Sequence, residues 1–309
     1  MPLKAAKTKP TVSIVGAGRL GTALARALAQ KDYSIEAVVA RRKRSAQRAA
    51  AIIRSRPLAL AHAELDQLPP SDILFITTAD DAIAETSARL AAVFASRKSQ
   101  GKSTALHASG ALSSEVLGAL SDAGFATGSM HPLVSVSDAR QGAESFAHAF
   151  FCVEGEPRAA RVARHVVRSL GGRSFHISAN DKALYHAAAV MASGHMTALF
   201  DIAEEMLARC GLEERRARAV LLPLLRSTLE NLYASTPAAA LTGTFARADT
   251  KTVRRHLNAL RSQKMTDALA AYVILGRRSL LLAKAAGASR DALKEIEVAM
   301  RNAECGMMN

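Results

Sequence analysis

Short apolar runs alternate with segments of helical periodicity over the first 178 residues. The run VSIV passes through a glycine turn into RLGTALARALAQ, whose apolar residues recur every three or four positions. The run DILFITT has no polar alternation, which is typical of a parallel strand covered on both faces. The remaining predicted strands are IEAVVA, STALHAS, ATGSMHPLV, AFFCVEG and RSFHIS, and the helices between them are SAQRAAAIIRS, SSEVLGALSDAG and PRAARVARHVVRSLG. This order predicts an α/β fold with a doubly wound, mainly parallel sheet.

The pattern changes after residue 178 and becomes almost wholly helical. Its interruptions are Gly211, Pro223, Pro237, the TGT turn at 242–244 and Gly287. We therefore expect two domains, an α/β domain over residues 1–178 and an all-helical domain over residues 179–309. At 100° per residue, one face of the helix that opens the second domain carries Lys182, Tyr185, His186, Ala189, Ser193 and Met196.

Composition sets the class of protein. Hydrophobic residues make up 49% of the chain and charged residues 22%, a globular balance that argues against extensive disorder. The opening segment MPLKAAKTKP has the composition of a short basic tail and lacks the apolar core of a signal peptide, so we expect a cytoplasmic protein. The three cysteines, Cys152, Cys210 and Cys305, are far apart, which predicts free thiols. No HExxH or close histidine pair indicates a metal site.

The net charge of +14 raises the question of a nucleic-acid partner. The arginines are spread along the chain, and only four tyrosines and nine phenylalanines are present to stack on bases. We therefore expect neither nucleic acid nor a membrane as partner. A basic surface would equally attract an anionic small molecule.

A glycine pattern between the first strand and the first helix carries the clearest chemistry. Gly16, Gly18 and Gly21 form GxGxxG, which suits a sharp turn, a close approach of the backbone to a pyrophosphate and tight helix packing. The amides of Arg19 and Leu20 then face the phosphates at the positive end of the helix dipole. The alternative is a simple tight turn in a doubly wound sheet. The pattern favours a Rossmann domain that binds a dinucleotide.

The segment ARRKRS stands where an NAD enzyme would end its second strand with an acid for the ribose hydroxyls. Arg41, Arg42, Arg44 and Ser45 would bind the extra phosphate of NADP, which an acid would repel. The alternative is a solvated basic stretch at the head of the next helix. We predict NADP as the cofactor.

Further candidates lie at the carboxyl ends of the predicted strands, where ligands of open parallel sheets bind. Thr77, Thr78 and Ala79 are expected beside the ribose and nicotinamide end of the cofactor. Ser109 and His131 follow or end later strands and are candidates for holding the substrate. For both His107 and His131, the alternative to a catalytic group is a buried imidazole bonded to a backbone carbonyl. Asp80 is expected to cap the helix that follows it.

Hydride transfer to a carbonyl or imine needs a proton donor beside the developing charge. Lys182 and His186 share a helix face that could point back towards the nicotinamide, and burial would lower the pKa of the lysine. The alternative is an ordinary helix start whose charges are solvated. We expect Lys182 and His186 to supply protons and His131 to orient the substrate.

The chain resembles a bacterial family that pairs a Rossmann domain with a helical C-terminal domain of unknown function. The resemblance rests on IVGAGRLG, LHASG, GSMHPLVSV, DKALYHAAAVMASGH and ALTGTFARADTKTVRRHL. That family is similar to the pyrroline-5-carboxylate, ketopantoate and deazaflavin-linked NADP reductases. The resemblance implies NADP, reduction of a small carbonyl or imine, and a homodimer formed through the helical domain. Lys182 stands where the related β-hydroxyacid dehydrogenases carry a catalytic lysine, and Tyr185 where they carry asparagine.

The sequence departs from that family at three positions. Gly194 replaces an asparagine, and Thr244 and Ala248 replace the proline and glycine of a TGP turn ending in Arg-Gly-Asp, so the segment 242–249 could be shaped differently. Three functions remain open: an NADP-dependent oxidoreductase acting on a small, anionic substrate, an NADP-binding sensor or scaffold without turnover, and a nucleic-acid-associated protein.

Overall fold

The computed structural model describes residues 9–95 and 103–305, which form two compact units, residues up to Ser193 and residues from Gly194 onward. The predicted basic tail lies largely outside the described residues, and so does the side chain of Cys305. Cys152 and Cys210 are free thiols. In the described part of the chain no helix has the length and apolar character needed to cross a membrane.

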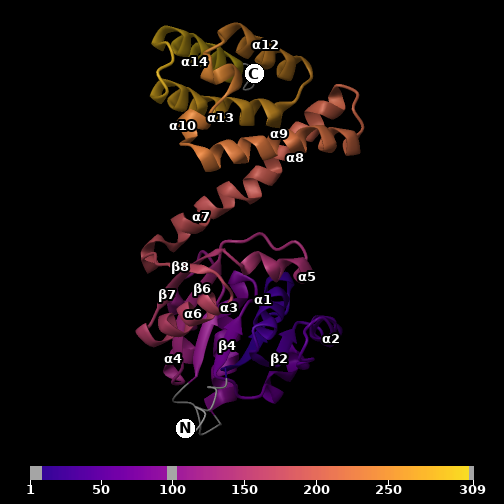
Figure 1. Ribbon diagram of the computed structural model, residues 1–309, viewed down its shortest axis with the longest axis vertical. Coiled ribbons are helices and arrows are strands. Elements are labelled where there is room, and N and C mark those ends of the chain that lie inside the picture. The colour runs from indigo at the N-terminus through magenta and orange to yellow at the C-terminus, as the bar shows by residue number, and fades with distance from the viewer. Residues whose placement is uncertain (1–8, 96–102, 306–309) are drawn as a thin grey trace, which may run out of the picture. The chain divides into compact units, whose positions relative to one another are not determined.

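An eight-stranded sheet forms the first unit (Figure 1). Its strands are β1 (Thr11–Val15), β2 (Ser34–Ala40), β3 (Leu58–Ala61), β4 (Ile73–Ile76), β5 (Thr104–His107), β6 (Ala126–Pro132), β7 (Phe150–Gly155) and β8 (Arg173–Phe175). The spatial order is β3-β2-β1-β4-β5-β6-β7-β8, and every neighbouring pair is parallel except β6 and β7. The predicted α/β fold with a doubly wound, mainly parallel sheet is confirmed.

Helices cover both faces of this sheet. They are α1 (Arg19–Gln30), α2 (Lys43–Ala51), α3 (Asp80–Ala95), α4 (Gly118–Asp122), α5 (Ala139–Gly142) and α6 (Pro157–Ser169), with 3-10 turns η1 (His62–Gln67), η2 (Ser114–Leu117), η3 (Glu144–Phe146) and η4 (Ala179–Asp181). The unit ends with α7 (Lys182–Ala192), of which only Lys182 is buried. Alternate residues of β1 enter different cores: Ile14 packs against α1, α2 and α6, while Val15 packs against α3 and α4. The fully covered sheet explains why its strands show apolar runs without polar alternation.

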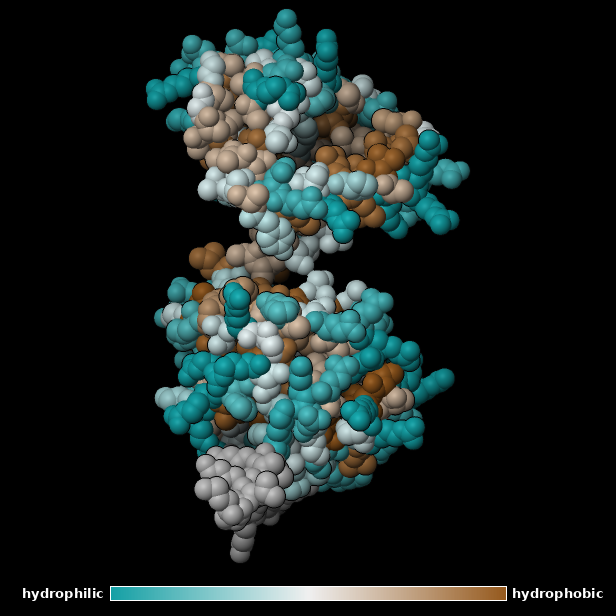
Figure 2. Space-filling view, viewed as in Figure 1, coloured by the Kyte–Doolittle hydropathy of each residue, from teal (hydrophilic) through white to brown (hydrophobic). Residues whose placement is uncertain are grey.

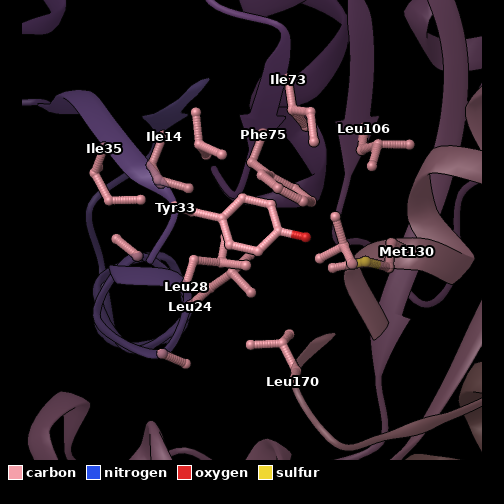
Figure 3. Close-up of a cluster of buried hydrophobic side chains, with 14 of the residues drawn as sticks. Ile14, Leu24, Leu28, Tyr33, Ile35, Ile73, Phe75, Leu106, Met130 and Leu170 are labelled. Carbon is pink, nitrogen blue, oxygen red and sulfur yellow. The ribbon is translucent and has the colours of Figure 1, made fainter. Parts of the chain in front are cut away.

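The core on the α1 side is shown in Figure 3. Leu24 and Leu28 of α1 lie against Tyr33 and against Phe75 of β4. The Tyr33 hydroxyl donates to Ser169 Oγ at 3.0 Å, so its one polar atom is satisfied within an otherwise apolar cluster. This packing fixes α1, and with it the glycine turn from which α1 starts.

The second unit is all-helical. Its helices are α8 (Gly194–Arg209), α9 (Glu214–Ala234), α10 (Pro237–Ala240), α11 (Gly243–Ala246), α12 (Thr250–Ser262), α13 (Thr266–Ala285) and α14 (Arg290–Cys305). Its core lies mainly between α12, α13 and α14. In the segment 242–249, Asp249 accepts from the amide and hydroxyl of Thr252 and so caps α12.

Three local expectations differ from the structure. The strand β3 was not predicted, because Leu58–Ala61 is short and directly follows Pro57. The segment SSEVLGALSDAG forms a 3-10 turn and a five-residue helix instead of one continuous helix. The unit boundary after Ser193 lies later than the predicted domain boundary after residue 178, because Lys182 of α7 is buried within the first unit.

Candidate functional site

The turn between β1 and α1 has the geometry of an anion site. Gly16 adopts φ +113°, and its amide and that of Ala17 both donate to Val39 O, at 2.9 and 2.7 Å. Gly18 is the N-cap of α1, and no side chain of the described residues caps the helix. The first-turn amides of α1 therefore face outward at the positive end of the helix dipole.

A hollow of about 720 Å³ lies beside this turn, and we call it the basic hollow. Three of the residues predicted to meet an extra phosphate line it: Arg41, Arg42 and Ser45. Arg44 does not line it, and the neighbouring Lys43 pairs with Glu64 at 2.7 Å. The other lining residues are Val15, Gly16, Ala17, Gly18, Val39, Ala40, His62, Thr77, Thr78, Ala79, Asp81, Ala82, Glu85 and Thr86.

A second hollow of about 420 Å³, here called the histidine hollow, lies over the ends of β4, β5 and β6. It is lined by Gly18, Arg19, Leu20, Thr77, Thr78, Ala79, Asp80, Ala108, Ser109, Gly110, His131, Pro132, Val134, Val136 and His186. Four residues, Gly18 and 77–79, line both hollows, so the two adjoin within the first unit, and we call them together the groove. The Thr78 hydroxyl in this groove is buried and has no hydrogen-bond partner among the described residues.

The Ser109 hydroxyl is fully engaged by the protein. It donates to Asp80 Oδ2 at 2.8 Å and accepts from the amides of Ala111 and Leu112, both at 3.1 Å. These bonds tie the loop after β5 to the start of α3. Ser109 therefore shapes the wall of the histidine hollow, and its hydroxyl has no hydrogen left to donate to a ligand.

Both ring nitrogens of His107 bond to the backbone, which is one of the two possibilities that the sequence left open for this residue. Its Nδ1 accepts from the Ser109 amide at 3.2 Å, and its Nε2 lies 3.1 Å from Ser113 O. Burial, together with the nearby Lys182, lowers the pKa of His107 to about 4. The imidazole is therefore neutral near pH 7, and it holds the loop that begins at Ser109.

Lys182, the first residue of α7, is buried within the first unit, next to the wall of the histidine hollow. Its side chain is 1% exposed, and its ammonium donates to Ser109 O at 3.2 Å and to Ser129 Oγ at 2.8 Å. Burial lowers the pKa of Lys182. The lysine holds the Ser109–Gly110 peptide from below and does not line the hollow.

His131 and His186 do line the histidine hollow, on either side of Gly110. Their ring centroids are 5.5 Å apart at an interplanar angle of 85°. A Cβ added to Gly110 would lie 2.9 Å from His131 Nε2 and would also meet His186 Nδ1, so only glycine fits between the rings. His186 Nδ1 is buried without a partner among the described residues. Burial, His186 and Lys182 lower the pKa of His131 to about 4, so it is neutral near pH 7.

Tyr185 is a site residue that the sequence analysis did not select. Its hydroxyl lies 2.7 Å from His131 Nδ1, and its ring packs edge-on against both His131 and Phe175. The sequence did contain a signal for Tyr185, because this residue shares a helix face with Lys182 and His186. Its contact with His131 could not be predicted, because it depends on how the chain folds. Asp80 and His62 were also missed as lining residues.

No group of three or more side chains that could hold a metal ion occurs in the described ranges. The fold and the groove together define a Rossmann-like protein whose second half is helical. Residues 3–132 match the Rossmann-like domain, and residues 149–279 match a domain of unknown function, DUF2520. The chain thus combines a Rossmann-like domain with a DUF2520 domain, in agreement with the predicted resemblance.

Solved structures show the same fold. A protein from Thermotoga maritima superposes with a TM-score of 0.67 at 21% identity, over 89% of this chain and 98% of that one. A candidate NADP oxidoreductase from Bacteroides fragilis gives 0.72 at 21% identity, over 88% and 98%. The 1-pyrroline-5-carboxylate reductase of Streptococcus pyogenes gives 0.57 at 14% identity, over 89% and 98%. A comparison with curated proteins found no match.

Proposed function

We propose that this protein is an NADP-dependent oxidoreductase that reduces a small carbonyl or imine compound. The observation that carries the proposal is that the hollow beside the uncapped start of α1 adjoins a hollow lined by His131, near the end of β6, and His186 of α7. A dinucleotide laid along the groove would have its diphosphate at the α1 amides and its nicotinamide near His131 and His186.

The residues of the groove fit such a cofactor. Gly18 has open space where a Cβ would lie, which leaves the backbone accessible to a diphosphate. Thr78 lines both hollows, and its buried hydroxyl has no partner among the described residues, so rotation of the side chain would let it bond to a polar ligand. When bound, a reduced nicotinamide supplies the hydride, and the substrate oxygen or nitrogen takes up a proton.

The side chains around the histidine hollow have different proposed roles. His131 and His186 reach the hollow and are the groups proposed to contact the substrate. Lys182, expected from the sequence to donate a proton directly, is proposed instead as a buried cation that positions the Ser109–Gly110 peptide. Ser109 acts through the backbone, because its hydroxyl is engaged by Asp80.

Preference for NADP over NAD is tested at the basic hollow. Changing both Arg41 and Arg42 to Glu should weaken NADPH binding at least about 100-fold, since each charged hydrogen bond contributes roughly 1.5–3 kcal/mol. NADH binding should change much less. Arg44→Glu in the same segment is the matched control, because Arg44 does not line the hollow. Calorimetric titration of both nucleotides is the measurement, and tighter binding of NAD than NADP by the wild type would overturn the preference.

A sensor or scaffold that binds NADP without turnover is the second candidate. The orphaned His186 Nδ1 and the close packing around Gly110 favour the enzyme, because a site built only to hold the nucleotide does not need two histidines at its far end. Deuterium transfer from 4-deuterated NADPH to any member of a panel of keto acids and cyclic imines supports the enzyme. Nucleotide binding with no transfer across the panel supports the sensor.

A second copy of this chain is proposed as the partner of α9. Of the 21 residues in this helix only Ala217 is buried, and Tyr233 is 92% exposed. Its other exposed apolar side chains are Val220, Leu222, Leu224, Leu229 and Leu232, and Figure 2 shows hydrophobic surface over the region of α8 and α9. Exposed apolar surface of this extent is typical of an interface between subunits.

Light scattering should therefore give twice the protomer mass of 32.7 kDa. Leu224→Glu combined with Leu232→Glu should reduce the mass to that of one protomer, because two charges would be buried unpaired in the interface. Leu58→Glu, an exposed leucine of the first unit, is the control and should leave the dimer intact. A wild-type protein of 32.7 kDa would rule this partner out.

A further inference from the structure

The hydrogen bond between Tyr185 and His131 determines which nitrogen of His131 carries the proton. A neutral imidazole has one N–H, so one ring nitrogen donates and the other accepts. The Tyr185 hydroxyl lies 2.7 Å from Nδ1. His131 Nε2 makes no hydrogen bond with any residue that the structure describes, and the ring lines the histidine hollow.

The imidazole proton of His131 can lie on Nδ1 or on Nε2 at this distance, and the two positions differ in how many hydrogen-bonding groups are satisfied. If Nδ1 carried the proton, it would donate to the Tyr185 oxygen, and the tyrosine hydrogen would have no acceptor among the described residues. If Tyr185 donates to Nδ1, a single bond satisfies both groups and the His131 proton resides on Nε2. Burial raises the pKa of Tyr185, so its hydroxyl keeps the hydrogen that this bond needs.

We propose that Tyr185 is a positioning residue that fixes His131 as the Nε2–H tautomer, so that the site accepts a carbonyl oxygen in preference to a protonated imine. This inference rests on the proposed reduction and specifies its substrate class. A carbonyl oxygen has lone pairs that accept the Nε2–H bond as negative charge develops on it. The nitrogen of a protonated imine carries a hydrogen and has no lone pair, so it cannot accept that bond.

The reaction balances without a proton from His131. The hydride of the reduced nicotinamide would add to the carbonyl carbon, the π electron pair would move to oxygen, and the oxygen would take a proton from water, whose hydroxide is neutralised by the buffer. His131 donates a hydrogen bond throughout and keeps its own proton. A neutral imidazole acting in this way polarises the carbonyl without requiring an imidazolium, which the pKa of about 4 makes scarce at pH 7.

The second unit offers a matched control. Tyr272 Oη lies 2.8 Å from His256 Nδ1, and these rings also meet edge to face, with centroids 5.8 Å apart. Tyr272→Phe removes a tyrosine–histidine hydrogen bond of the same kind without touching either hollow. Tyr185→Phe removes only the hydroxyl at the site and keeps the ring contact with Phe175.

The primary measurement is nitrogen-15 NMR of the histidine rings at pH 7, with the His131 signals assigned by their loss in His131→Gln. Wild-type protein should show His131 protonated on Nε2 and not on Nδ1. Tyr185→Phe should bring a substantial Nδ1–H population, whereas Tyr272→Phe should leave His131 unchanged. Wild-type His131 protonated on Nδ1, or an unchanged tautomer in Tyr185→Phe, would overturn the proposal.

Kinetics and binding test the substrate class. We expect Tyr185→Phe to lower kcat for a carbonyl substrate about 10- to 100-fold, with NADPH affinity within about threefold of wild type. A kcat/KM that favours cyclic imines over carbonyl compounds would contradict the preference. If no substrate of the panel is reduced, the proposed reduction is wrong. The NMR measurement of the His131 tautomer still tests whether Tyr185 is a positioning residue. In that case a shift of the His131 Nε2–H signal on adding pyruvate, but not on adding a cyclic imine, supports the carbonyl preference, and the reverse pattern overturns it.

Discussion

A Gly16→Ala variant is expected to lose NADPH binding by more than about 100-fold and to unfold at lower urea concentration. Gly16 adopts φ +113°, a conformation that alanine rarely adopts. A Cβ at this position would lie 2.5 Å from Thr77 C and from Thr78 N. Both are backbone atoms of the strand-end segment that lines the groove, so the turn or that segment must move. The strain alone corresponds to about 1–3 kcal/mol, and urea unfolding with calorimetric titration measures both effects.

Gly18→Ala is the matched control, two residues further along the same turn. Its φ of −77° suits any residue, and the nearest atom to an added Cβ is Gly16 O at 4.0 Å. Stability should therefore change by less than about 1 kcal/mol, the usual effect of alanine at an N-cap. NADPH binding should still fall about tenfold, because the methyl group occupies the space a diphosphate would use. Unchanged binding in Gly18→Ala would show that no ligand approaches this turn.

Lys182→Met is expected to lower turnover about 100-fold while leaving NADPH affinity within about threefold of wild type. The side chain is of similar length, but it cannot donate to Ser109 O or to Ser129 Oγ. The Ser109–Gly110 peptide then keeps only the longer bond from Ser129 Oγ to Ser109 O, at 3.4 Å, and displacement of a reacting group by about 1 Å can cost 100-fold in rate. Deuterium transfer from 4-deuterated NADPH measures turnover, and calorimetry measures nucleotide affinity.

Ser129→Ala separates the two bonds of Lys182. It removes the hydroxyl that accepts from Lys182 at 2.8 Å, together with that hydroxyl's 3.4 Å bond to Ser109 O, and keeps the bond from the ammonium to Ser109 O. Turnover should fall by less than about tenfold, since the peptide keeps the shorter of its two donors. Wild-type turnover in Lys182→Met would remove Lys182 from the mechanism altogether.

Most strands of the sheet could be predicted because their short apolar runs differ from the three-to-four-residue periodicity of the helices. Runs such as DILFITT are covered on both faces and are recognisable as buried strands. The direction of β7 was not predictable, because an apolar run is the same whether it pairs parallel or antiparallel, and β6 and β7 are antiparallel. The short β3, with two alanines among its four residues, carries too little apolar pattern to identify.

For the candidate site, the strand ends led to residues that line one hollow but not to their individual contacts. His131 and His186 were chosen from separate parts of the chain, and the structure brings them together around Gly110. The side-chain contacts at this site depend on tertiary packing, which the spacing of residues along the sequence does not determine. Hence the engagement of the Ser109 hydroxyl by Asp80, the burial of Lys182 and the partnership of Tyr185 with His131 emerge only in three dimensions.

The sharing of Gly18 and residues 77–79 by the two hollows has a consequence for affinity. A molecule whose halves occupy both hollows is tethered by its own covalent bonds, so once one half is held the other is presented at an effective concentration on the order of millimolar. Each fragment alone must meet the full entropic cost of association. Each half alone is therefore expected to bind much more weakly than the intact molecule, so a ligand that spans both hollows would be selected for its covalent linkage as well as for its contacts.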